Sequence, residues 1–371
     1  MYPSDFHKAN QNISLYIHFP WCIKKCPYCD FNSHKITNNN FDKYVKHLIN
    51  DLNIHHGKTL AEKQIQSIFF GGGTPSLLPA GLVNQLLINI EKVSKFSPNI
   101  EITLEANPGT VERDSFQHYK TAGINRVSLG VQSFQNDKLK ALGRIHDNKS
   151  TYQALLEIHQ SGISNFNIDI MHGLPLQTVK DALYDLESAL SYNPTHLSWY
   201  QLTIEPNTLF YHQQPILPDE DTLEAIEAKG KELITQNNLA QYEVSAYSTN
   251  THTQSMHNKN YWLFGDYIGI GAGAHSKLTN SNSKIRRIWK YKHPNVYQQQ
   301  NSSYIQGEET ISDNEVIYEF MLNALRLKSG FSLNLFEKRT GFSRNTILPK
   351  IKELEQQGLL NLFNDQTLTT E

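Results

Sequence analysis

Cysteine is nearly absent from this chain of 371 residues, and its three copies stand together between positions 22 and 29. Three cysteines cannot pair completely, so a disulfide framework is excluded. No window approaches the ~18 continuous apolar residues of a membrane span, and residues 1–14 lack the apolar run of a secretory signal. We therefore expect a cytoplasmic protein without a transmembrane segment, for which peripheral contact with a membrane stays open.

An excess of basic charge is also missing, because 34 Lys and Arg stand against 36 Asp and Glu and give a net charge of −2. A chain without a basic field is not expected to bind a nucleic acid backbone. With 39% hydrophobic residues the chain is too apolar for a disordered one. Its length suggests two or three domains and allows a large core.

The first two thirds of the chain alternate between strand-like and helix-like apolar patterns. This rhythm predicts an α/β fold with a parallel sheet, and six units favour a partial (β/α)6 barrel over residues 1–240. A doubly wound open sheet is the alternative, and both folds place function at the carboxyl ends of the strands. The expected strands are 14–19, 65–70, 101–105, 126–131, 166–171 and 196–202. The expected helices are 41–55, 79–93, 111–121, 135–142, 149–160, 177–191 and 220–237.

Beyond residue 240 the rhythm is lost. Residues 241–305 form an expected extension, with a strand at 242–247, a glycine-rich run at 269–275 and a polar loop from 278 onward. Residues 306–371 predict a small winged-helix-like module with three helices and a terminal hairpin. Since it has no basic recognition helix, we expect this module to pack against the barrel rather than to bind DNA.

The cysteines follow the first predicted strand with the spacing Cys22-x3-Cys26-x2-Cys29. Three thiolates on one short loop can ligate three irons of a four-iron cluster and leave the fourth iron open to a small chelating molecule. A zinc site is the main alternative, because His18 or His34 could complete a Cys3His set. Zinc sites usually pair cysteines across a longer gap, so the spacing favours the cluster over zinc and over unligated thiols.

This loop resembles the radical S-adenosylmethionine (SAM) superfamily, in which an aromatic residue usually precedes the last cysteine, as Tyr28 does here. The resemblance implies a [4Fe-4S] cluster on Cys22, Cys26 and Cys29 whose open iron binds the amino and carboxylate groups of SAM. It also implies that a reduced cluster, served by an electron donor, cleaves SAM to a 5′-deoxyadenosyl radical.

Further segments are similar to the superfamily branch that contains coproporphyrinogen oxidase: GGGTP at 71–75, LEANP at 104–108 and RVSLGVQSF at 126–134. Carboxylates suit an ammonium or ribose hydroxyls, an amide suits a ribose, and a guanidinium suits a carboxylate. A plain turn is the alternative for the glycines, and an ion pair or a turn cap is the alternative for the acids. In that branch the positions of Thr203 and His275 also line the site. The residues that the resemblance implies around SAM are Tyr16, Gly72, Gly73, Thr74, Glu105, Gln132, Arg144 and Asp169.

Within this branch the chain resembles the haem chaperones of the HemW type. The oxygen-independent coproporphyrinogen III oxidases have a fourth cysteine where this chain has Phe31, and a longer N-terminal arm. The segment HNKNYW at 257–262 matches the HNxxYW segment of the chaperones. The resemblance implies haem as a ligand, a haem-acceptor protein of unknown identity as a partner, and function without the oxidase reaction. Oxidative decarboxylation of coproporphyrinogen III is the alternative function.

A haem iron ligand is expected at His257, because imidazole commonly holds haem iron and aromatic rings suit a porphyrin face. Tyr261 and Trp262 would provide such rings. The alternative is structural, with His257 capping a turn and the two rings packing against the barrel. The other candidate ligands are His18, His252 and His275.

Overall fold

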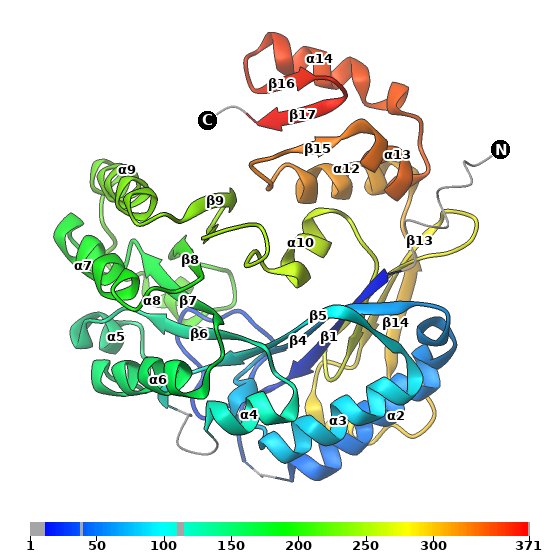
Figure 1. Cartoon of the computed structure of the whole chain (residues 1–371), viewed down its shortest axis with the longest axis horizontal. Helices are drawn as coiled ribbons and strands as arrows, with labels where there is room; N and C mark the ends of the chain where they lie inside the picture. The colour runs from blue at the N-terminus through cyan, green and yellow to red at the C-terminus, as the bar shows by residue number, and fades with distance from the viewer. Residues whose placement is uncertain (1–11, 38–39, 110–114, 370–371) are drawn as a thin grey trace.

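The computed structural model describes residues 12–37, 40–109 and 115–369. Six parallel strands lie side by side in chain order, and a seventh, β11 (Tyr267–Ile270), pairs in parallel with the other edge of the first of them. The helices that connect the six strands cover one face of this sheet, which excludes the doubly wound alternative with helices on both faces (Figure 1). The sheet is open, so the expected partial (β/α)6 barrel is confirmed (Figure 1). The six strands are β1 (Asn12–Phe19), β4 (Gln64–Gly72), β5 (Lys95–Ala106), β6 (Arg126–Gln132), β7 (Asn165–His172) and β8 (His196–Gln201).

Helices connect the strands and cover the outer face of the curved sheet (Figure 1). The expected helices appear, some with shifted ends; α8 is additional, and residues 111–114 of the expected helix 111–121 lie outside the described residues. These helices are α2 (Phe41–Ala61), α3 (Ala80–Val93), α4 (Phe116–Ala122), α5 (Asn136–Ala141), α6 (Asn148–Ser161), α7 (Val179–Leu190), α8 (Leu209–Gln213) and α9 (Glu220–Gln236).

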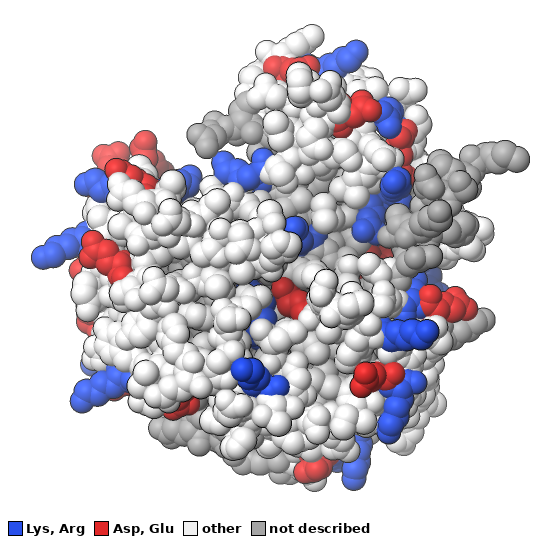
Figure 2. All heavy atoms as spheres, viewed as in Figure 1, with Lys and Arg blue, Asp and Glu red and all other residues white. Residues whose placement is uncertain are grey.

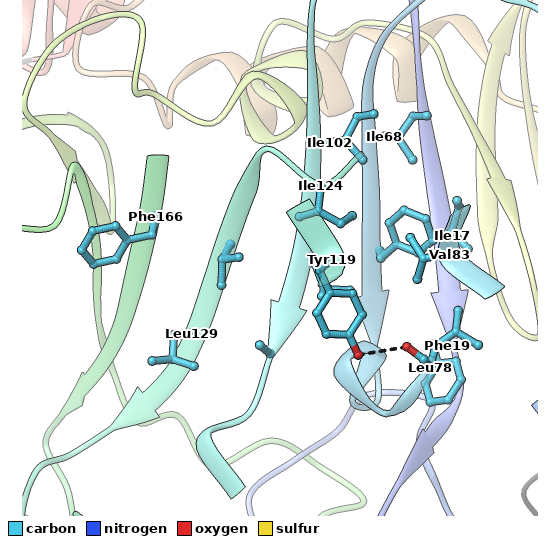
Figure 3. Close-up of a cluster of buried hydrophobic side chains, with 14 of the residues drawn as sticks. Ile17, Phe19, Ile68, Leu78, Val83, Ile102, Tyr119, Ile124, Leu129 and Phe166 are labelled. Atoms are coloured by element: carbon cyan, nitrogen blue, oxygen red, sulfur yellow. Dashed lines mark hydrogen bonds between the residues drawn. The ribbon is translucent and has the colours of Figure 1, made fainter. Parts of the chain in front are cut away.

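The main core lies between this helical layer and the sheet. Apolar side chains of the strands, such as Ile17 and Ile68, are fully buried against helix residues such as Val83 (Figure 3). Tyr119 is buried among them, and its hydroxyl donates to the carbonyl oxygen of Leu78 at 3.0 Å, so its polar atom is paired inside the core (Figure 3). This packing fixes the strand ends that carry the site.

The extension differs from the sequence prediction. Part of the expected polar loop at 278–305 differs, because residues 285–290 form a strand of the main sheet that pairs antiparallel on both sides. Charged residues such as Arg286 and Arg287 interrupt its apolar pattern, although the strand is half-buried. The expected strand at 242–247 is also wrong, since an antiparallel pair of short strands stands there. The elements are β9 (Ala240–Glu243), β10 (Ala246–Ser248), α10 (Met256–Trp262), β11 (Tyr267–Ile270), β12 (His275–Thr279), β13 (Ile285–Lys290), α11 (Pro294–Tyr297) and β14 (Ile305–Thr310).

The C-terminal module has the expected three helices and terminal hairpin around a second core. Phe320 lies at its centre and meets Phe264 of the extension edge to face, with ring centroids 5.7 Å apart. The module therefore packs on the extension, while the domain limits at 240 and 305 stay predictions. Its elements are α12 (Asp313–Ala324), β15 (Phe331–Ser332), α13 (Leu333–Thr340), α14 (Leu348–Gln356), β16 (Leu360–Phe363) and β17 (Gln366–Thr369).

The surface agrees with the balanced composition. On the face drawn in Figure 2, acidic and basic side chains are interspersed. No helix among the described residues is both long and apolar enough to cross a membrane.

Candidate functional site

A cavity of about 360 Å³ opens at the carboxyl ends of the parallel strands, where α/β folds of this kind place their ligands. The cysteine loop and the ends of β4, β5, β6, β7 and β8 line it together with segments from the extension and the C-terminal module. The sequence-predicted residues in its lining are Cys22, Cys26, Cys29, Gly72, Gly73, Thr74, Glu105, Gln132, Arg144 and Asp169.

The cysteine loop follows β1 and is closed by its own pair of short strands. β2 (Trp21–Cys22) pairs in parallel with β3 (His34–Lys35). Inside the loop, the N–H of Cys29 donates to the carbonyl oxygen of Cys26 at 3.1 Å, which makes a tight turn between the last two cysteines. The loop therefore has a defined shape within the polypeptide itself.

Asn32 anchors this loop to the extension. Its Nδ2 donates to the carbonyl oxygens of Ala272 and Lys292, each at 2.9 Å, and its own carbonyl bonds His18 Nε2 at 2.9 Å. A Cβ at Gly273 would stand 2.3 Å from Asn32 Nδ2. Glycine is needed there because the two segments approach so closely.

The thiols fit a cluster better than a single ion. Burial raises the pKa of Cys22 and Cys29, and a bound cation would reverse this by stabilising thiolate. In the described part of the chain, no three His, Cys, Asp or Glu side chains converge closely enough to hold one metal ion. The rings of His18 and His34 are already bonded to Asn32. A four-iron cluster takes one thiolate per iron and so accepts more widely spaced thiols.

The glycine run brings the end of β4 against the start of the cysteine loop. Gly72, with φ at 114°, donates its N–H to Glu105 Oε2 at 3.1 Å, and Gly73 donates to the carbonyl oxygen of Phe19 at 2.7 Å. A Cβ on Gly73 would stand 2.5 Å from the carbonyl oxygen of Trp21. Both amides are thus engaged inside the protein, and the small residues allow β4 to end against the start of the cysteine loop.

Two carboxyl groups face the same cavity. Burial, and secondarily the charge of Asp169, raises the pKa of Glu105 to about 8. Burial also raises the pKa of Asp169, which accepts hydrogen bonds from Ser128 Oγ at 3.1 Å and Asn167 Nδ2 at 2.7 Å. Two neighbouring acids with raised pKa values make a place where a ligand cation would be stabilised.

Replacing Glu105 by glutamine should stabilise the ligand-free protein at pH 8 and change it little at pH 5. A pKa raised to about 8 on folding means that folding retains a proton, so stability falls as pH rises from about 4.3 towards 8. Glutamine keeps the acceptor for Gly72 without the charge, and we expect a gain of roughly 1–3 kcal/mol at pH 8. Urea unfolding at both pH values measures it. Glu224→Gln, at an exposed position on α9, is the control, and equal gains at the two pH values would contradict the prediction.

The end of β6 turns side chains towards the cysteines. Gln132 lies in the left-handed region at φ 69°, beside a register shift after Gly130, and its Oε1 accepts from the Tyr200 hydroxyl at 2.7 Å. Arg144 Nη2 donates to the Gly130 carbonyl at 2.6 Å, and its Nη1 lies 3.9 Å from Cys26 Sγ. Arg144 therefore places a positive charge directly beside the cysteine loop.

Tyr16 and His257 line a second cavity of about 200 Å³. Glu105 and Asp169 border both cavities, so the two are adjacent. The sequence prediction put Tyr16 in the same shell as the other SAM residues. The structure instead places it one layer deeper in the barrel.

His257 is fully enclosed at the start of α10. Its Nδ1 bonds Ser67 Oγ at 3.0 Å and its Nε2 bonds the Tyr261 hydroxyl at 2.9 Å. Burial, helped by the charge of Arg126, lowers its pKa to about 3, so the ring is neutral. Binding haem iron would require one of these bonds to break, and this geometry favours the structural alternative.

The remaining candidates lie elsewhere. Thr203, His252 and His275 are exposed and line neither cavity, and both ring nitrogens of His18 are hydrogen-bonded. No histidine among the described residues lines the larger cavity. The described lining of that cavity therefore offers no histidine ligand for haem iron.

Sequence reasoning missed much of the cavity wall. The strand-end rule could have found Tyr200, since it stands near the end of β8. Glu243 and Arg326 come from segments that only tertiary packing brings to the cavity, and no local pattern marks them. Asn258 and Trp262 belong to the HNKNYW segment that the sequence had singled out.

Comparison with known proteins defines the class first. The family model described as the radical SAM superfamily matches residues 16–188, and the model described as the HemN C-terminal domain matches residues 311–370. The solved structure of coproporphyrinogen III oxidase (HemN) from Escherichia coli covers 98% of this chain and 87% of its own, with a TM-score of 0.81 and 21% identity, which shows the shared fold. The fold is that of a radical SAM protein, and the superfamily implies a [4Fe-4S] cluster and SAM.

Relatives with similar sequences identify the family within this superfamily. The chain is 45% identical to heme chaperone HemW of Escherichia coli (strain K12), over 97% of this chain and 94% of that protein. It is 46% identical to heme chaperone HemW of Haemophilus influenzae with the same coverages, and 32% identical to that of Bacillus subtilis (strain 168) over 94% and 92%. The chain belongs to the HemW family.

Proposed function

We propose that this protein binds haem and transfers it to an acceptor protein, while holding a [4Fe-4S] cluster on Cys22, Cys26 and Cys29 and SAM beside it. One observation carries the proposal: the cysteine loop and the strand-end polar residues share a cavity with Asn258 and Trp262 of the HNxxYW helix α10. The family relationship over nearly the whole chain supports it. The acceptor and the electron donor have no assigned identity.

In this proposal the three thiolates bind three irons, and the open iron would be chelated by SAM, which supplies radical chemistry when the cluster is reduced. Glu105 and Asp169 would stabilise the SAM ammonium or its ribose hydroxyls. Arg144, next to Cys26, would attract the carboxylate, and Gln132 would bind the ribose. Gly72, Gly73 and Thr74 would form the wall that the methionine part contacts, and Tyr16 would support it from the deeper cavity.

Adding SAM to cluster-loaded protein should change the EPR signal of the reduced cluster. Glu105→Ala should weaken this response, because a carboxylate that can face the ammonium is lost. Glu224→Ala on the surface of α9 is the matched control and should respond like wild type. An unaltered spectrum at saturating SAM in wild-type protein would refute SAM binding at the cluster.

Haem titration tests the function itself, and we expect stoichiometric binding with a Soret band but no conversion of coproporphyrinogen III when SAM and reductant are present. The oxidase alternative is favoured by the HemN-like fold. Against it, Phe31 stands where the oxidase has a further cysteine, and its side chain is 61% exposed at the cavity. Protoporphyrinogen formation would establish the alternative, and a wild-type protein that binds no haem would sink the chaperone function.

The variant His257→Ala decides the role of that histidine within the same titration. If His257 is an iron ligand, its removal should shift the Soret maximum and weaken haem binding. As a packing residue bonded to Ser67 and Tyr261, its loss would lower the unfolding temperature and leave the Soret position unchanged. Ligation by His257 stays a prediction until this spectrum is measured.

A further inference from the structure

The C-terminal module contributes a cation to the wall of the cysteine cavity. Arg326 follows helix α12, and its side chain lines the cavity together with Trp262 of α10. The Arg326 guanidinium carbon lies 4.2 Å from the centroid of the Trp262 ring, the separation of a cation–π pair. Figure 1 shows α12 directly beyond α10, away from the helical layer of the barrel. Two segments about 60 positions apart therefore build one composite surface.

This arginine has hydrogen-bonding capacity to spare. Among the described residues, the acceptor on its guanidinium is Glu243 Oε2, at 3.2 Å from Nη2. Its Nε is buried without a partner, and so is the indole Nε1 of Trp262. A guanidinium carries five N–H donors, and unpaired buried donors cost free energy unless something else satisfies them. The Arg326 side chain is 36% exposed, so a ligand in the cavity can reach it.

Glu243 does not depend on Arg326 alone. It also accepts from the backbone N–H of Ser245 at 3.2 Å and from the Ser245 hydroxyl at 3.3 Å. A ligand carboxylate could therefore also bind the Arg326 guanidinium, and Glu243 would still accept its hydrogen bonds from Ser245. Arg326 therefore presents a planar cationic group with several donors beside an aromatic plane.

We infer that Arg326 and Trp262 form a recognition site for a flat ligand with carboxylate arms: Arg326 pairs with a propionate and Trp262 packs beside the macrocycle. The inference rests on the proposed haem function and specifies which groups select haem. SAM also has a carboxylate, but Arg144 already stands 3.9 Å from Cys26 Sγ, where the cluster-bound amino acid would lie. Arg326 belongs instead to the wall made by α10, β9 and the C-terminal module.

The test compares haem with haem dimethyl ester, whose propionates are neutral, in the full-length cluster-loaded protein. Arg326→Gln should weaken haem binding about tenfold and ester binding by less than about threefold, because a charge-assisted hydrogen bond is lost only with the free acid. The haem affinity of Arg326→Lys should lie between those of wild type and Arg326→Gln, since lysine keeps the charge but lacks the planar guanidinium. Trp262→Leu should weaken both ligands. Arg344→Gln is the control, because Arg344 also pairs with carboxylates of its own module but does not line the cavity.

Each outcome has a definite meaning. Equal weakening of haem and ester by Arg326→Gln indicates a structural role for Arg326 and overturns the inference, and so does unchanged binding of both. Loss of the SAM-induced EPR change in Arg326→Gln, with haem binding intact, assigns Arg326 to SAM and also overturns it. If the wild-type protein binds neither haem nor the ester, the proposed haem function is wrong. If only the Arg326 inference is wrong, wild type binds haem and Arg326→Gln binds it equally well.

Discussion

Replacing Cys22, Cys26 or Cys29 by alanine should remove most of the iron and the broad visible absorbance from anaerobically reconstituted protein. These are the sole cysteines of the chain, so no other thiol can substitute. Each replacement removes one of three protein ligands to the cluster. Iron and sulfide analysis after gel filtration gives the measurement.

Ser33→Ala is the matched control for this loss. The Ser33 hydroxyl lies 4.0 Å from Cys29 Sγ, so the variant changes the surroundings of the thiol while keeping all three sulfurs. We expect nearly full iron content in Ser33→Ala. A triple cysteine variant that keeps a full cluster would contradict the ligand assignment altogether.

Gly73→Ala is expected to be the most disruptive single-methyl change in the site. The added Cβ would stand 2.5, 2.8 and 2.9 Å from three backbone atoms of Trp21, the residue that directly precedes Cys22. Backbone cannot rotate away as a side chain can, so the start of the cysteine loop must shift. We expect a loss of about 1–3 kcal/mol in unfolding free energy, together with reduced cluster loading.

The chain provides a control for this substitution at Gly81, on α3. A Cβ at Gly81 meets nothing within 4 Å. Gly81→Ala should therefore be neutral or stabilising by up to about 1 kcal/mol, since alanine favours helix more than glycine does. If Gly73→Ala unfolds at the same urea concentration as Gly81→Ala and loads iron normally, the close packing of Gly73 against the loop has no energetic role.

The order of the barrel strands, and which residues lie at their carboxyl ends, could be predicted from the sequence. Apolar patterns of period two and period 3.6 report local conformation, and a parallel sheet built from such units carries all its strand ends to one edge. Glu105, Gln132 and Asp169, far apart in the chain, could thus be expected near Cys22 before any coordinates existed, and the structure has all four in the lining of one cavity.

Other features depend on contacts between distant segments, which no local pattern records. Residues 278–305 look polar, yet β13 within them pairs with its sequence neighbours β12 and β14, and this sheet reaches the distant β1 through β11. The glycine run brings β4 close to Trp21. The sequence alone suggested His257 as a haem iron ligand, yet its Nδ1 is hydrogen-bonded to Ser67, which lies on a strand 190 positions earlier.

The sequence by itself determined the cysteine loop, the strand–helix rhythm and the strand-end polar residues, because spacing and periodicity are local properties. Only the tertiary structure decided which residues form the cavity wall made by α10, β9 and the C-terminal module. Trp262 and Arg326 meet there because the C-terminal module packs on the extension through a separate apolar core, and side-chain packing across such a distance depends on the shape of both folded parts.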